Sequence, residues 1–289
     1  ADPGSPDFGQ LAFAGFEQNG VDSVGGVGAP VALAVSADGL NVYVAGAEQD
    51  TLATFRRNRT ASSADFGLLE YRSHFTNNQD GVAGLAGVRD VAVSANGEWV
   101  FALGAENGTV AVFDRDASTG ELVFDSFIQD GVGDARGLTA ARSLLLDDAT
   151  GTLYVSGPAS IARYAVDLGA GVLTFVDEVG NGDDAPLTGG EVFGLDDVAA
   201  LALSPDGDHV YAAAAGRDAA LTFQRPVDDS SLQFKQILIE GQGGVAPGSD
   251  VEYVITVENL GPSEVSQARV VDQFPQEFES VAWVCSAVE

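Results

Sequence analysis

The sequence predicts an all-β protein: a β-propeller of four complete four-stranded blades plus one orphan outer strand, followed by a partial immunoglobulin-like β-sandwich. Three observations predict this class. Four short apolar runs form a unit that occurs four times in the 289 residues. The chain also contains 36 glycines, which favour many turns. An aromatic residue in the second run recurs at steps of 58, 53 and 57 residues, a period typical of propeller blades, at Tyr43, Phe101, Tyr154 and Tyr211.

The order of the runs assigns a place to each strand of a blade. The first run is short and built from small apolar residues, which suits an innermost strand, as in Val31–Val35, Val91–Val93 and Leu201–Leu203. A Ser-x-Asp/Asn-Gly turn follows in three units and predicts a tight hairpin to the second strand. The fourth run alternates apolar and polar residues, so it is expected at the outer edge.

The repeat also sets the expected domain limits. Residues 1–29 contain the outer strand of a preceding blade and a connecting loop, and residues 245–289 a partial sandwich module. The blades between them are expected at about 30–87, 88–140, 141–197 and 198–244.

Both ends of the chain are expected to carry open β edges. The orphan strand Gly9–Phe13 precedes the first full blade, and the sandwich is expected to begin with Val251–Val257. Unpaired backbone groups at such edges attract a further strand. We therefore expect the edges to be completed by adjoining segments of the same protein or by a second copy, through Leu11, Phe13, Tyr253 and Val257.

The charge balance excludes several partners. Asp and Glu number 43 against 13 Lys plus Arg, a formal net charge of −30. Nucleic acid and anionic membrane surfaces would be repelled, and no apolar run is long enough for membrane insertion. The acidity favours either solubility in saline water or binding of divalent cations.

Two segments resemble known families. The blades, with Ser204-Pro-Asp-Gly207 before His209-Val-Tyr211, resemble YVTN/lactonase-like seven-bladed propellers over about residues 9–240. The tail, with Pro247-Gly-Ser249 and Asn259-Leu-Gly-Pro262, is similar to the start of a DUF11 module. The second resemblance implies an extracellular or cell-surface protein of a prokaryote.

No residue pattern predicts catalysis. Of the two histidines, His209 follows a hairpin turn and His74 lies at the rim, so neither is expected to act as a general base. The only cysteine, Cys285, falls in the expected sandwich. The catalytic residues of the lactonase-like family find no matching positions here.

The loops between blades contain Asp next to Gly, which offers oxygen ligands on a flexible backbone. The strongest cluster predicts a calcium site at Asn181, Asp183 and Asp184. The alternative is that these acids cap turns, or that Arg89, Arg136 and Arg142 neutralise them.

We therefore expect a non-enzymatic extracellular structural or adhesive protein, a segment of a larger secreted or surface fibre or adhesin that assembles through its open β edges. No cofactor other than calcium is expected. A glycan- or protein-binding propeller is the alternative function, and a lactonase-like hydrolase is the third.

Overall fold

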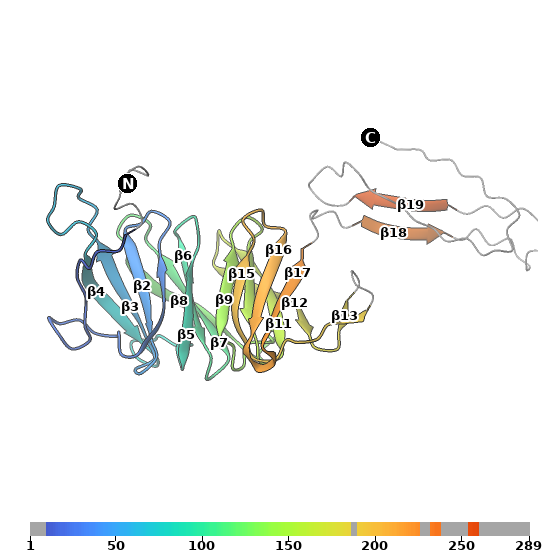
Figure 1. Cartoon of the computed structure of the whole chain (residues 1–289), viewed down its shortest axis with the longest axis horizontal. Helices are drawn as coiled ribbons and strands as arrows, with labels where there is room; N and C mark the ends of the chain where they lie inside the picture. The colour runs from blue at the N-terminus through green and yellow to red at the C-terminus, as the bar shows by residue number, and fades with distance from the viewer. Residues whose placement is uncertain (1–9, 186–189, 226–231, 238–253, 260–289) are drawn as a thin grey trace, which may run out of the picture. The chain divides into compact units, whose positions relative to one another are not determined.

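The computed structural model describes residues 10–185, 190–225, 232–237 and 254–259. The chain divides into two compact units, Ala1–Arg225 and Pro226–Glu289. Apart from the short 3-10 helix η1 (Ala215–Arg217), the regular structure of the described residues is entirely β. The all-β class is therefore confirmed, with four blades in the first unit (Figure 1).

Each of the first three blades is a four-stranded antiparallel sheet in chain order. Blade 1 comprises β1 (Pro30–Val35), β2 (Asn41–Gly46), β3 (Thr51–Arg57) and β4 (Leu69–Thr76). Blade 2 comprises β5 (Val88–Val93), β6 (Trp99–Gly104), β7 (Thr109–Arg115) and β8 (Leu122–Gln129). Blade 3 comprises β9 (Ser143–Asp147), β10 (Thr152–Ser156), β11 (Ser160–Asp167) and β12 (Val172–Gly180).

Blade 4 has three strands, β15 (Val198–Leu203), β16 (His209–Ala214) and β17 (Ala219–Gln224). A two-residue pair, β13 (Asp184–Ala185) and β14 (Gly190–Glu191), precedes it. The first strands contact one another from blade to blade, β1 with β5, β5 with β9, and β9 with β15. The prediction that the first run forms the innermost strand is confirmed.

Two details of the predicted strand set are wrong. The expected outer strand of blade 4 forms as β18 (Leu232–Ile237), but β18 pairs with β19 (Val254–Asn259) instead of β17. A strand at a sheet edge is held by one ladder only, and β19 satisfies the backbone groups of β18 over six residue pairs. Residues 10–13 of the expected orphan strand are not in a strand, and Leu11 and Phe13 are 101% and 84% exposed. Among the described residues, no strand pairs with residues 10–13.

The remaining edge residues have different positions. Val257 pairs with Phe234 inside the two-stranded sheet of the second unit, so this side of β19 is already occupied. Tyr253 lies outside the described residues, as do Cys285 and most of the expected sandwich, for which residues 260–289 are not described.

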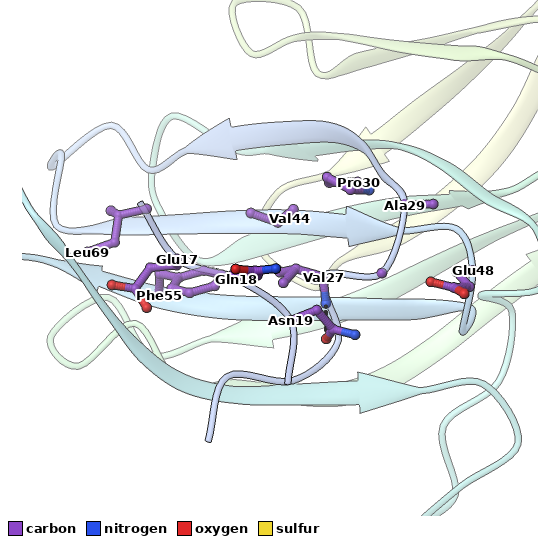
Figure 2. A pocket seen from close by; sticks show the side chains of 11 residues that line it. Glu17, Gln18, Asn19, Val27, Ala29, Pro30, Val44, Glu48, Phe55 and Leu69 are labelled. Atoms are coloured by element: carbon purple, nitrogen blue, oxygen red, sulfur yellow. Dashed lines mark hydrogen bonds between the residues drawn. The ribbon is translucent and has the colours of Figure 1, made fainter. Parts of the chain in front are cut away.

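Blade 1 presents one sheet face that no other blade covers. Leu33 and Val35 of β1 project from this face and are 65% and 50% exposed. The loop before β1 covers part of it, and a pocket of about 460 Å³ remains between this loop, Val44 and Phe55 (Figure 2).

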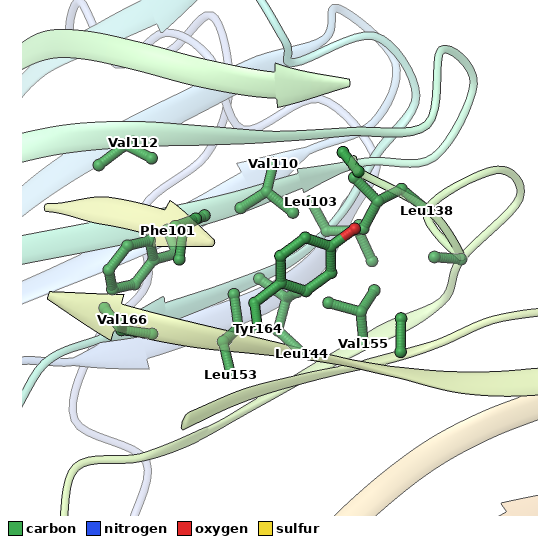
Figure 3. Packing of buried hydrophobic residues seen from close by; sticks show 14 of the residues in the cluster. Phe101, Leu103, Val110, Val112, Leu138, Leu144, Leu153, Val155, Tyr164 and Val166 are labelled. Atoms are coloured by element: carbon green, nitrogen blue, oxygen red, sulfur yellow. The ribbon is translucent and has the colours of Figure 1, made fainter. Parts of the chain in front are cut away.

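The core lies between blades, where the facing sides of two sheets bury apolar side chains. Between blades 2 and 3, Phe101, Leu103 and Val112 pack against Leu153 and Val155 (Figure 3). Tyr164 lies at the centre of this layer and is fully buried. Successive side chains along each strand point to opposite faces of the sheet, so each inner blade contributes to two such layers.

A buried arginine joins blade 1 to blade 2. Arg115, at the end of β7, is 0% exposed and donates from Nε to the hydroxyl of Tyr43 at 2.6 Å. Its Nη2 donates to Asp38 Oδ2 at 2.8 Å and to Asn41 Oδ1 at 2.9 Å, and its Nη1 to the carbonyl of Gly97 at 2.6 Å. We call this arrangement, an arginine of one blade bound by the turn and second strand of the preceding blade, the arginine latch.

Replacing Arg115 with methionine should lower the free energy of unfolding of the four blades by about 3 kcal/mol, because it leaves Asp38, Asn41 and Tyr43 without their shared donor. Asp38 keeps 32% of its side chain exposed, which holds the loss at the lower end of the range for broken buried pairs. Urea unfolding followed by circular dichroism measures it.

The matched control is Arg72→Met, which removes an exposed pair with Glu70. It should change the free energy of unfolding by less than about 1 kcal/mol. Equal effects of the two substitutions would contradict the structural role of the latch.

Candidate functional site

The loops between blades meet the starts of the inner strands, and each loop is held by the same device. An Asn or Asp side chain accepts a hydrogen bond from the backbone N–H of an apolar residue later in the loop. Asn77 binds Leu85 N at 3.1 Å, and Asp130 binds Leu138 N at 3.0 Å. Leu85 and Leu138 are both fully buried, so these loops are anchored in the core.

One of the predicted calcium ligands, Asn181, takes part in the same device. Asn181 accepts from Leu195 N at 2.9 Å, and Asp183 accepts from Gly180 N at 2.7 Å. Asp184 lies in β13, opposite Glu191. Among the described residues, no group of three His, Cys, Asp or Glu side chains could hold a metal ion. The calcium site stays a prediction, and the observed roles of Asn181 and Asp183 are those of turn caps.

The start of the inner strand carries a β-bulge in three blades. The register of β5 against β6 shifts between Val88 and Asp90, so Arg89 is the bulged residue. The same shift occurs in blades 1 and 4, where the bulged residues are Val31 and Ala199. A bulge re-aims its side chain away from the regular pleat. Only blade 2 places a charged residue there.

Arg89 is exposed, and no carboxylate of the described residues lies within ion-pair distance of it. In a chain with a formal charge of −30, an unpaired arginine is available for an anionic or carbonyl-bearing ligand. The sequence alone predicts for Arg89 only the neutralisation of neighbouring acids.

Asp90 follows directly and is partly buried. Its Oδ2 accepts from the backbone N–H of Leu144 in blade 3 at 2.8 Å, and its Oδ1 from Val91 N at 2.9 Å. Burial raises the pKa of Asp90 above its ordinary value, against the opposing effect of these hydrogen bonds and one from Ser143. A carboxylate with a raised pKa is a stronger base.

A second arginine lies at the corresponding point of blade 3. Arg142, just before β9, pairs through Nε with Asp197 Oδ1 at 2.7 Å, and both side chains are half exposed. Asp197 precedes β15, so this ion pair joins the starts of two inner strands. Arg136, the third arginine considered, lies over the ring of Phe175 at 5.6 Å and belongs to the blade edge.

Arg89, Asp90, Arg142 and Asp197 thus lie at the starts of β5, β9 and β15, and we call these four residues the axial cluster. The missed signal was in the repeat itself. Where blades 1 and 4 read Pro-Val-Ala-Leu and Val-Ala-Ala-Leu, blade 2 reads Val-Arg-Asp-Val. Charged residues at positions that are apolar in the other copies are not required for packing of the blade.

The histidines lie away from this cluster. His74 is on the outer strand β4, with Nδ1 2.6 Å from the hydroxyl of Tyr71. A groove of about 630 Å³ adjoins His74 on the outer side of blades 1 and 2. His209 lies at the start of β16 and stacks on Tyr211, with ring centroids 6.2 Å apart.

Part of the chain matches a known family. Residues 17–132 match the family described as lactonase, 7-bladed β-propeller. The periplasmic gluconolactonase of Pseudomonas aeruginosa superposes with a TM-score of 0.53 at 20% identity, over 68% of this chain and 50% of that one. No curated protein sequence matches this chain significantly.

A Bacteroides uniformis protein, provisionally described as a 6-phosphogluconolactonase, superposes with a TM-score of 0.53 at 18% identity, over 68% of this chain and 50% of that chain. The chain thus spans about half the length of the solved structures it matches. At these identities the superpositions establish the propeller fold.

The family match overturns our expectation of a non-enzymatic structural or adhesive protein, and with it the glycan- or protein-binding alternative. Residues 17–132 match a family described as lactonase, and both superposed structures are described as lactonases. The expectation rested on the lack of a histidine, serine or cysteine placed with a catalytic partner.

Asp90 should titrate above the ordinary aspartate value of 3.8, because its partial burial disfavours the charged form. The measurement is an NMR titration of aspartate carboxyl carbons, with Asp90→Asn used to assign the signal. Asp116, whose pKa is lowered by hydrogen bonds from Ser118, serves as the internal comparison. A titration of Asp90 below that of Asp116 would contradict the electrostatic assignment.

Proposed function

We propose that this protein hydrolyses a lactone, with the axial cluster as its catalytic site. The observation that carries the proposal is the match of residues 17–132 to a lactonase family, because this segment contains Arg89 and Asp90. The two superposed structures are described as acting on gluconolactone or its 6-phosphate, so a sugar lactone is the proposed substrate class.

The cluster supplies the two groups that lactone hydrolysis requires. Water must lose a proton as it attacks the ring carbonyl carbon, and the carbonyl oxygen must carry the resulting negative charge. Asp90, with its raised pKa, is the proposed base. Arg89 has no carboxylate partner among the described residues and is the proposed donor to the oxyanion.

The proposed reaction proceeds in two steps. Asp90 accepts a proton from water while the water oxygen bonds to the carbonyl carbon, and the oxyanion forms beside Arg89. The ring C–O bond then breaks, the carbonyl re-forms, and Asp90 returns the proton to the departing alkoxide oxygen. The product is the open-chain hydroxy acid, and no other reactant is consumed.

Two further features of the site support this assignment. The hydrogen bond from Leu144 N orients Asp90 from the neighbouring blade, so the base is fixed by two blades at once. Arg142 is already paired with Asp197, which leaves it suited to hold polar groups of the substrate more weakly than Arg89 does.

We also propose that the protein acts outside the cytoplasm. No helix among the described residues is long and apolar enough to cross a bilayer. The strongly acidic surface, the periplasmic origin of one superposed structure and the DUF11-like residues after 245 support this location.

Substituting the proposed groups should abolish most of the turnover of glucono-δ-lactone by the full chain. Asp90→Asn keeps an acceptor for Leu144 N but removes the base, and should lower kcat/KM by about 10²–10⁴-fold. Arg89→Ala removes the oxyanion donor and should lower kcat by about 10²–10³-fold. A pH-stat assay of acid release measures both.

The control is Arg72→Ala, which removes an exposed arginine on the outer strand β4. It should retain the parent activity. Absence of lactone turnover in the parent protein, or unchanged turnover in both site variants, would contradict the proposed function.

The pH dependence follows from the direction of the Asp90 shift. A base acts only when deprotonated, so kcat/KM should be full above the raised pKa and fall as the pH drops through it. The fall should begin at a higher pH than it would for an ordinary aspartate with a pKa of 3.8. Stopped-flow assays across the acidic range, corrected for spontaneous lactone hydrolysis, test this. If the residual activity of Asp90→Asn showed the same fall of kcat/KM at low pH, the fall would belong to the titration of another group.

A further inference from the structure

The groove of about 630 Å³ on the outer side of blades 1 and 2 has an aromatic floor. The rings of Phe75 and Phe124 both pack on Phe113, at centroid distances of 5.2 and 5.5 Å. Blades 1 and 2 are complete four-stranded sheets, so the strands on both sides of the groove are present. We call it the rim groove, and its lining includes Phe75, Thr76, Asp80, Val82 and Phe124.

At the equivalent place in blade 3, the chain itself supplies an arginine. Leu85 and Leu138 are anchored alike in the loops before blades 2 and 3. Two positions before them stand Ala83 in the first loop and Arg136 in the second. The guanidinium of Arg136 lies over the ring of Phe175, 5.6 Å from its centroid. An arginine side chain therefore covers an aromatic ring at the rim of blade 3.

Phe124 is the counterpart of Phe175 in blade 2. Phe124 pairs with Phe113 of β7. Phe175 pairs with Tyr164 of β11 at the equivalent register. Ala83 has no side-chain atom beyond Cβ, so it cannot extend over the ring of Phe124 as Arg136 extends over that of Phe175. The rim groove is the space that this difference in side-chain length leaves open.

The surroundings of Arg136 show what holds a guanidinium at this place. Besides lying over the ring, its Nη1 donates to the carbonyl of Asp134 at 3.3 Å. Gly81 stands at the position of Asp134, and its backbone lines the rim groove. Asp80 adds an exposed carboxylate that makes no ion pair within the described part of the chain. Aromatic rings, backbone and a carboxylate are the partners that a guanidinium uses.

We propose that the rim groove binds an arginine side chain of a partner protein, with the guanidinium over the ring of Phe124. The formal net charge of −30 attracts a basic segment of such a partner. A planar guanidinium stacks on an aromatic face and is more weakly hydrated than an ammonium, so arginine is preferred to lysine. Free arginine is a poorer ligand, because its own carboxylate is repelled by Asp80. The proposal does not depend on the lactonase activity.

Titration of the full chain with N-acetyl-arginine amide tests the proposal. The signals of isotope-labelled phenylalanine rings report binding by NMR, and Phe124→Leu assigns the ring. We expect a Kd on the order of millimolar, as one partly exposed cation–π contact gives. The citrulline analogue has nearly the same shape without the charge and should bind at least about 5-fold more weakly. Free arginine and N-acetyl-lysine amide should also bind more weakly than the probe.

Two reciprocal substitutions exchange the two places. Ala83→Arg puts an arginine of the chain itself over Phe124 and should weaken binding of the probe at least about 10-fold, because a tethered side chain competes at a high effective concentration. Arg136→Ala uncovers Phe175 and should create a second site for the probe. The matched control is Ala170→Arg, on the exposed turn between β11 and β12. It adds the same charge and should leave the Kd within about 2-fold.

Circular dichroism of each variant confirms that the blades remain folded. A change of the Phe175 signal when the probe is added to Arg136→Ala supports the proposal, and its absence contradicts it. Three other results overturn it: no binding of the probe to the parent chain at roughly 20 mM, equal binding of the citrulline analogue, or a Kd in Ala83→Arg equal to that in Ala170→Arg.

Discussion

The packing of one blade face against the next is the constraint on which the whole molecule depends. No single blade encloses a core, because each is one sheet thick and buries side chains only against a neighbour. Burial of Phe101, Leu103 and Tyr164 between two blades illustrates the arrangement. The strands, the inter-blade loops and the axial cluster are all positioned by this stacking.

The architecture could be predicted because it repeats. Four copies of the same apolar runs, with a marker aromatic at Tyr43, Phe101, Tyr154 and Tyr211, average out the ambiguity of any one strand. The wrong predictions concern strand pairing, which the repeat does not determine. The partner chosen by Leu232–Ile237 and the lack of a strand at residues 10–13 depend on which edges are available, and edge pairing is not encoded in alternation alone.

The site was harder to predict than the fold for a related reason. Arg89 and Asp90 occupy a strand that the pattern assigns to the core, and only the bulge explains how charges are tolerated there. The hydrogen bond from Leu144 N, which orients Asp90, comes from a blade more than fifty residues later in the chain. Residue types and spacing within one repeat contain no information about such a contact. Asn181 and Asp183, two of the predicted calcium ligands, accept hydrogen bonds from backbone N–H groups, and the calcium site stays a prediction.

Arg225 pairs with Asp147 and joins blade 4 to blade 3, whereas Val166 stands at the position of Arg115 between blades 2 and 3, so no arginine latch forms there. This difference has a consequence for folding. Four similar blades could dock in a wrong order, a known failure of repeat proteins. If blade 4 docked on blade 2, Arg225 would meet Phe101 and Asn96, and its buried charge would lack a carboxylate partner. If blade 3 docked on blade 1, Asp38 would face Val166. Burial of an unpaired charge is strongly unfavourable. The alternation of latched and unlatched contacts therefore disfavours wrong pairs of blades and specifies the neighbour of each blade.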